Sequence, residues 1–227
     1  MIFTIDHIVF AASPTQGREL RDRLAAVGFH PEVFMLEFPE IGAKSESLSY
    51  AGGGFVEFVT EADPVLSPRV WFSEGPRVIG LGFGSDDFEN DTQWPSESGS
   101  WVMDEDHILP DGSRLNIHAA GPHHHRSDFY VFVMDRPDGQ LQFPEGPERP
   151  RLRHLDFVGA EADVWRERLG RWLGLRSTQG GLSIADTELR FLPGDQPSVR
   201  VSPTFEVTSA AADIGLAGSV FRLLASS

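Results

Sequence analysis

The sequence contains no cysteine. Disulfides, thiolate metal sites and cysteine nucleophiles are therefore excluded, and the cytoplasm becomes the expected location. Apolar runs also fall short of the ~18–20 residues that a membrane-spanning helix requires. The first ten residues lack a basic segment and a small-residue cleavage site, so they predict a first strand rather than a secretion signal. These absences together predict a soluble cytoplasmic protein.

Basic residues are few: 19 Lys and Arg stand against 34 Asp and Glu, giving a net charge of −15. Such a surface repels phosphate backbones and anionic lipid, so we expect neither a nucleic-acid nor a membrane partner. The 227 residues, 40% of them hydrophobic, suffice to bury a substantial core. The charge does not say what the protein binds instead.

Signature motifs of several enzyme classes are also missing. The sequence has no P-loop, no G-x-S-x-G and no H-E-x-x-H, so hydrolase and NTPase functions lack support. The GLGFG run at 80–84 lies within a predicted strand and opens no helix, which excludes a dinucleotide fingerprint. His123–His125 follows Gly-Pro and precedes a polar segment, and a solvated loop is the preferred interpretation over a metal tract.

A repeated order of elements is the strongest pattern present. Residues 3–12 alternate and are rich in β-branched residues, which predicts a strand. The run Ser13-Pro14-Thr15-Gln16 predicts a helix start, with a capping residue, a proline at the first position and Gln three residues later. Gly28 is placed to end that helix. Three strand-like stretches follow at 33–38, 47–51 and 55–60, which completes a β-α-β-β-β unit.

The same order returns further along the chain, and a weaker copy lies between. A strand at 151–158, a helix at 163–173 and three short strands up to 192 form the later unit. The middle copy has only a stunted helix at 86–95. Two more strands are predicted at 199–208 and 219–224, with no assigned position. The predicted units span residues 1–61, 77–135 and 151–227.

Three short segments carry a family resemblance: Ile5-Asp6-His7-Ile8-Val9-Phe10, Phe55-Val56-Glu57-Phe58-Val59 and Leu152-Arg153-His154-Leu155-Asp156-Phe157. With the repeated units, they resemble the vicinal-oxygen-chelate, or glyoxalase-like, superfamily. That superfamily includes glyoxalase I, methylmalonyl-CoA epimerase, extradiol dioxygenases and bleomycin-binding resistance proteins. The resemblance implies an α+β fold in which paired β-α-β-β-β units curl mixed sheets around a cavity, commonly with a divalent metal.

The resemblance also implies a ligand set, with His from a first strand and Glu from a fourth strand. Carried over residue by residue, it assigns His7, Glu57 and His154 as metal ligands. Imidazole and carboxylate suit Zn, Mn, Ni or Fe alike. In the later unit Arg190 aligns with Glu57, and Glu188 lies two residues earlier on the same face, so Glu57 and Glu188 are the candidate catalytic carboxylates.

The two-residue period of strands predicts which side chains share a face. Ile8 and Phe10 should pack under the helix, while Ile5, His7 and Val9 face the opposite side.

In the fourth strand Phe55, Glu57 and Val59 should share one face, and His154 and Asp156 should do so in the later unit. The glycines of the middle unit leave a bare face that a ligand or another backbone could approach. Asp156, Gly80 and Gly82 are therefore predicted pocket residues.

Ordinary structural roles compete with each of these assignments. His7 and His154 can be hydrogen-bonded strand histidines, and Glu57 can be a carboxylate paired to an arginine. Asp156 and Glu188 can be surface carboxylates.

Two hypotheses for function follow. The first is a metal-dependent lyase, isomerase or dioxygenase, in which a divalent ion polarises a carbonyl or enediolate. The second is a metal-free protein that binds or sequesters an apolar small molecule, supported by an incomplete ligand set and an aromatic content of 11%. Purely structural repeats are a third interpretation. Because three units leave one without a partner, a homodimer is also considered.

Overall fold

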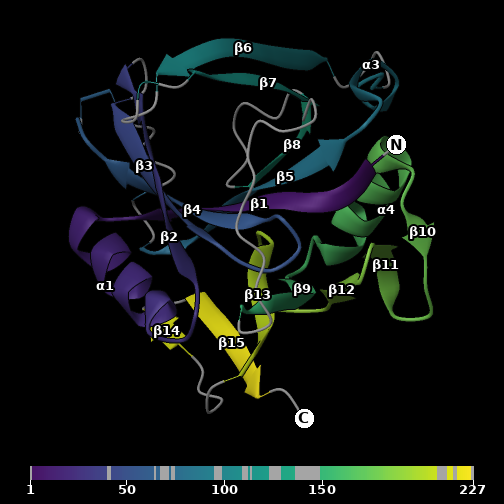
Figure 1. Cartoon of the computed structure of the whole chain (residues 1–227). Helices are drawn as coiled ribbons and strands as arrows, with labels where there is room; N and C mark the ends of the chain where they lie inside the picture. Colours follow the sequence, from purple (N-terminus) through teal and green to yellow (C-terminus); the bar gives the residue numbers. More distant parts are fainter. Residues whose placement is uncertain are drawn as a thin grey trace.

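Figure 1 shows the chain as a computed structural model. The structure describes residues 2–39, 42–63, 65–66, 72, 75–94, 99–108, 112, 114–122, 129–135, 149–208, 214–216 and 219–225. The strands are β1 (Ile2–Ala12), β2 (His30–Phe38), β3 (Ala43–Ser49), β4 (Phe55–Glu61), β5 (Arg77–Ser85), β6 (Ser100–Ile108), β7 (Arg114–Pro122), β8 (Tyr130–Asp135), β9 (Arg151–Val158), β10 (Arg176–Ser177), β11 (Gly181–Ile184), β12 (Thr187–Leu192), β13 (Arg200–Val207), β14 (Ile214–Leu216) and β15 (Ser219–Ala225). The helices are α1 (Pro14–Ala25), α3 (Phe88–Asp91) and α4 (Ala162–Leu173). None of the described helices is long and apolar enough to cross a membrane.

The strands form two mixed sheets. The first has eight strands in the order β2-β3-β4-β1-β5-β8-β7-β6, so the first and middle units lie side by side through an antiparallel β1/β5 contact. We call this part the N-terminal module. The second sheet has seven strands in the order β10-β11-β12-β9-β13-β15-β14, and we call it the C-terminal module.

The tail of the chain is a shortened fourth unit. In the N-terminal module β1 is antiparallel to β5, and β5 is parallel to β8. In the C-terminal module β9 is antiparallel to β13, and β13 is parallel to β15, which repeats that arrangement. The third unit therefore has a partner within its own chain. This removes the sequence argument for a homodimer, and the oligomeric state stays a prediction.

The start of α1 and the end of α4 form as the sequence predicts, whereas α1 ends at Ala25, capped by Ala26, before the predicted Gly28. Ser13 caps α1 in a capping box with Gln16, and Pro14 occupies the first turn. Leu20 and Leu24 on α1 are buried. Helix α4 ends at Gly174, whose φ of 60° is the left-handed conformation that glycine adopts without strain.

A β-bulge in β1 changes which side chains face inward. Ile5 pairs with Phe83 and His7 with Gly82, so Asp6 is the extra residue. A one-residue slip reverses the faces. Ile5 consequently joins the buried cluster of Ile8 on the helix side. The prediction that Ile5 shares a face with His7 is wrong for this reason.

The same bulge occurs in the C-terminal module. Leu152 pairs with Phe205 and His154 with Thr204, which leaves Arg153 as the extra residue of β9. The two modules therefore share this bulge, and His154 corresponds to His7, although the β1/β5 pair has two further register shifts.

The eight-stranded sheet curls until its two edges approach. Strands β2 and β6 are opposite edges, yet the rings of Phe38 and His107 lie 6.2 Å apart. Side chains of many strands consequently meet inside the curl. This interior cluster consists of Val9, Ala11, Leu36, Ala43, Phe55, Val59, Ile79, Leu115, Ile117, Ala119, Phe132 and Met134. All of these residues belong to strands.

The outer faces of the two modules share one core (Figure 1). The rings of Phe10 and Phe221 lie 5.4 Å apart, and those of Phe29 and Phe205 lie 4.8 Å apart. Helix α1 of the N-terminal module contacts β14 of the C-terminal module. On the other side, Trp165 of α4 meets Phe129 of the middle unit with ring centroids 5.0 Å apart. Each long helix thus serves both modules.

We predict that Phe205→Ala destabilises both modules together. Phe205 is fully buried and contacts Phe29 and Tyr50 of the N-terminal module. Truncating such a side chain leaves a cavity and costs about 3–5 kcal/mol. Urea denaturation followed by circular dichroism and tryptophan fluorescence should show one transition at a lower midpoint. Val102→Ala, at a position 66% exposed, is the control. Two separated transitions, with only one shifted, would contradict a shared core.

Candidate functional site

His7 and Glu57 meet in the interior of the N-terminal module. Strands β1 and β4 are parallel neighbours, with His7 opposite Phe55 and Val9 opposite Glu57. The His7 Nε2 atom lies 3.6 Å from Glu57 Oε2, beyond ordinary hydrogen-bond length. His7 is 5% exposed and Glu57 is 8% exposed. The sequence prediction that Glu57 shares a face with Phe55 and Val59 is confirmed.

The bulge residue Asp6 holds the other side of the imidazole. Asp6 is fully buried, and its Oδ1 lies 2.7 Å from His7 Nδ1. A carboxylate at one ring nitrogen fixes the orientation of the ring, because that nitrogen carries the proton it donates. Nε2 is thereby directed toward Glu57. The pair and its orienting carboxylate come from only two strands.

Aromatic rings enclose the imidazole. His7 stacks on Phe55 with centroids 4.5 Å apart and meets the edge of Phe132 at 4.9 Å. A Cβ atom at Gly82 would lie 2.8 Å from the His7 ring, and one at Gly80 would lie 2.7 Å from the Tyr130 ring. The bare face of β5 is therefore occupied by these two rings. Gly80 and Gly82 border the site, because the absence of a side chain lets the Tyr130 and His7 rings approach the backbone of β5.

Tyr130 adds a protonated phenol to this interior. Burial and, to a smaller extent, the negative charge of Glu57 raise the pKa of Tyr130 far above its ordinary value. The hydroxyl group is therefore a hydrogen-bond donor at any physiological pH.

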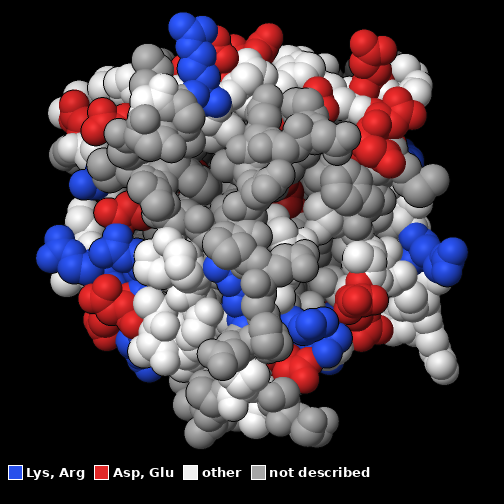
Figure 2. All heavy atoms as spheres, viewed as in Figure 1, with Lys and Arg blue, Asp and Glu red and all other residues white. Residues whose placement is uncertain are grey.

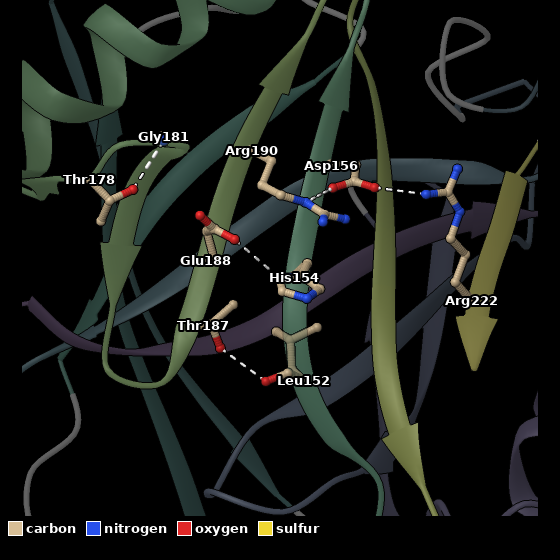
Figure 3. Close-up of polar contacts among 9 residues, drawn as sticks. All are labelled: Leu152, His154, Asp156, Thr178, Gly181, Thr187, Glu188, Arg190 and Arg222. Atoms are coloured by element: carbon tan, nitrogen blue, oxygen red, sulfur yellow. Dashed lines mark hydrogen bonds and ion pairs between the residues drawn. The ribbon is translucent and has the colours of Figure 1, made fainter. Parts of the chain in front are cut away.

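Polar side chains of the C-terminal module lie on one face of its sheet (Figure 3). His154 Nδ1 lies 3.5 Å from Glu188 Oε2. Asp156 is fully buried and accepts hydrogen bonds from Arg190 Nε at 2.6 Å and from Arg222 Nη1 at 2.9 Å. Figure 3 shows the two arginines reaching Asp156 from opposite sides.

The environment of His154 disfavours its charged form. Burial lowers the pKa of His154 most, and the adjacent charge of Arg190 lowers it further, against the opposing effect of Glu188. The imidazole is therefore neutral at pH 7.

Strand register allows the two modules to be compared residue by residue. His7 lies opposite Phe55 and His154 opposite Glu188, so Arg190 occupies the position of Glu57. The sequence alignment of these two residues is confirmed.

The strands on the other side of each histidine correspond in the same way. His7 lies opposite Gly82 and His154 opposite Thr204. Gly82 in turn pairs with Phe132, and Thr204 with Arg222. Positions that are apolar or bare in the N-terminal module are thus polar in the C-terminal module.

The structure does not bring the three predicted metal ligands together. His7 and Glu57 share one interior, whereas His154 belongs to the other sheet. Within the part of the chain that the structure describes, no three His, Asp or Glu side chains form a group that could hold a metal ion. His123–His125 lies outside the described residues.

The donor set of each module is a poor fit to a divalent ion. Two ligands of a tetrahedral ion, each about 2.1 Å away, lie about 3.4 Å apart, so the separation of His7 and Glu57 would suit shared binding. The facing positions on β5 and β8, however, are Gly82 and Phe132, which offer no donor. In the C-terminal module Arg190 replaces the carboxylate.

Sequence reasoning missed the partners that complete both clusters. Asp6 next to His7 was visible in the sequence, but only the bulge turns it toward the ring. Arg222 had no local signal, because its strand β15 joins the site only through pairing with the distant β13. Asp156 was predicted at a pocket; it is the buried acceptor of two arginines, and the pocket stays a prediction.

The comparisons with known proteins rest on structure alone. No family model matches the sequence, and neither does any curated protein. A hypothetical protein from Staphylococcus aureus matches with a TM-score of 0.69 and 9% identity, over 99% of this chain and 100% of that one. A mutant of 4-hydroxymandelate synthase from Streptomyces coelicolor matches with a TM-score of 0.58 and 14% identity, over 91% and 71%.

A third structure, a xylose isomerase-like TIM barrel/4-hydroxyphenylpyruvate dioxygenase fusion protein, matches with a TM-score of 0.58 and 13% identity, over 91% of this chain and 36% of that one. The synthase and the fusion protein are members of the vicinal-oxygen-chelate superfamily. The chain has the glyoxalase-like fold. At such low identities the likeness establishes this fold and its α+β class with curled mixed sheets, as the sequence resemblance predicted.

We predict that Gly82→Ala destabilises this protein and displaces His7. The added methyl group would lie 2.8 Å from the His7 ring and 3.0 Å from Phe132. Overpacking of this kind costs about 1–3 kcal/mol. Gly170→Ala is the matched control. Gly170 lies in helix α4, where alanine is favoured over glycine, and the added methyl group would lie at an ordinary contact distance of 3.7 Å from Leu182. Thermal unfolding should show a lower midpoint for the first variant and a raised or equal midpoint for the control.

We predict that His154 titrates below the ordinary histidine range. Nuclear magnetic resonance of the imidazole should show its pKa rising in Arg190→Gln and falling further in Glu188→Gln, because these charges act in opposite directions. As the pH falls below about 6.5 the unfolded chain takes up this proton first, so His154 lowers folding stability on the acidic side. A pKa unchanged in both variants would contradict the electrostatic cause.

Proposed function

We propose that this protein binds a small organic molecule in the interior of its N-terminal module, with the His7–Glu57 pair as the polar contact and without a resident metal ion. One observation supports this most directly. A histidine and a carboxylate are buried against each other inside a cluster that is otherwise aromatic and aliphatic.

Burying these groups is costly. Each polar or charged group taken out of water without full hydrogen bonding costs roughly 1–3 kcal/mol or more. The neighbouring interior side chains, such as Phe132, are apolar, so the pair differs from the cluster around it. Buried ionisable groups that a fold does not require concentrate at functional sites.

The surroundings suggest the chemistry of the ligand. Phe55 and Phe132 flank the imidazole, which favours an aromatic or aliphatic body. Glu57 accepts hydrogen bonds and Tyr130 donates them, so a hydroxyl, amide or carbonyl group on that body would be recognised. A ligand with an acidic proton would place it against Glu57, the predicted catalytic carboxylate.

A metal-dependent lyase, isomerase or dioxygenase is less well supported. It needs donors beyond His7 and Glu57, and Gly82 and Phe132 at the facing positions supply none. Likeness to 4-hydroxymandelate synthase is a likeness of fold at 14% identity and does not supply the missing ligands.

A binding screen in the presence of a chelator tests this proposal. The intact protein, freed of metal with EDTA, is screened by thermal shift against phenols, aryl amides and matched hydrocarbons. We expect compounds that carry a hydrogen-bond donor to raise the melting temperature. Glu57→Gln should weaken their binding about tenfold or more, because a charge-assisted hydrogen bond is lost.

Glu61→Gln, on the same strand but partly exposed, is the control and should bind as the unmodified protein does. Stabilisation that appears only after Mn, Zn, Ni or Fe is added would overturn the metal-free proposal. Equal affinity in Glu57→Gln would show that the pair is not the contact.

A further inference from the structure

We propose a second binding site, for the carboxylate or phosphate group of a small molecule, on the polar face of the C-terminal sheet. Arg190, Arg222 and Thr204 would contact the oxyanion. The site lies in the other module from His7 and Glu57, and the inference does not depend on the function proposed above.

Two guanidinium groups are fixed at one place by a shared acceptor. Arg190 donates through Nε to one oxygen of Asp156, and Arg222 donates through Nη1 to the other. A guanidinium has five N–H donors, so each retains several beyond its bond to Asp156. Their geometry is set before any ligand arrives, which lowers the entropic cost of binding an anion.

The two arginines reach solvent although their acceptor does not. The side chain of Arg190 is 31% exposed and that of Arg222 is 47% exposed, whereas Asp156 is fully buried. A guanidinium needed only to neutralise a buried carboxylate requires no such exposure, and one arginine would suffice for the charge. The second arginine leaves a positive charge on the solvent side of the pair.

An unsatisfied hydroxyl group lies beside them. Thr204 is 2% exposed, and its Oγ1 is buried without a hydrogen-bond partner among the described residues. It is the residue opposite both His154 and Arg222 in the strand register. A buried hydroxyl group without a partner costs free energy, and an oxyanion held by Arg222 would supply the missing acceptor.

The comparison between modules shows that this cluster is not a by-product of the fold. The positions of Arg190, Arg222 and Thr204 hold Glu57, Phe132 and Gly82 in the N-terminal module, on the same sheet framework. The framework therefore accepts a glycine at the position of Thr204 and an apolar residue at that of Arg222. Glu188 carries a negative charge on the same face, but its side chain is 35% exposed, so water screens its effect on the arginines more than it screens that of buried Asp156.

The surface as a whole does not attract anions. The chain carries a net charge of −15, and on the face in Figure 2 the described acidic and basic side chains are interspersed. Anion binding would therefore be local to the arginine pair rather than a property of a basic surface.

The proposal is tested by isothermal titration calorimetry with inorganic phosphate and with acetate. Chloride keeps the ionic strength constant in each titration. We expect at least one of the two anions to bind saturably and with a higher affinity than chloride. Arg222→Gln should weaken it about 10- to 100-fold, the effect of losing a charge-assisted hydrogen bond. The affinity of Arg222→Lys should lie between those of the unmodified protein and Arg222→Gln, because lysine keeps the charge but lacks the paired N–H donors of a guanidinium. Preference for phosphate or for acetate identifies which group the natural ligand carries.

Thr204→Val separates ligand binding from folding. Removing an unsatisfied hydroxyl group should leave the melting temperature equal or higher, while oxyanion affinity falls severalfold. Arg176→Gln, an exposed arginine on β10, is the charge-matched control and should change nothing. Saturable binding absent in the folded protein, or unchanged in both Arg222→Gln and Thr204→Val, would overturn the proposal. Ligands of the His7–Glu57 interior should bind Arg222→Gln normally, so the two sites can fail independently.

Discussion

The antiparallel contact between the first strands of paired units, with its one-residue bulge, is the constraint on which the rest depends. In both modules this contact determines which residues of the central strands point into the curl. Without the bulge, Asp6 would point away from the histidine, and Ile5 would enter the interior. The polar cluster and the hydrophobic face therefore come from the same irregularity.

Much of the fold could be predicted from the sequence, because its signals are local. The capping box at Ser13, the left-handed Gly174 and the alternating strand at 3–12 depend only on neighbouring residues, and all were found as expected. The repeated element order then pointed to paired units. The family resemblance carried by the short segments around His7, Glu57 and His154 then supplied the fold class.

The candidate site was less predictable, because its partners are set by pairing between distant strands. Three units in the sequence left two ways to pair, and the tail strands β13 and β15 showed no signal of being a fourth unit. His7 and Glu57 met because they belong to one unit. His154 was expected to join them, and only the sheet order shows that it faces Glu188 in another module. A bulge likewise leaves no reliable mark in a single sequence.

The contacts of the long helices have a consequence for whether either module can be stable alone. Helix α1 contacts β14 of the C-terminal module, and Trp165 of α4 packs on Phe129 of the middle unit, whose own helix α3 has four residues. Either module alone would expose the aromatic side chains of its outer face, including Phe10 or Phe205, to solvent. The two modules therefore depend on each other for a buried core, while the polar face of each sheet can change its chemistry without disturbing that core.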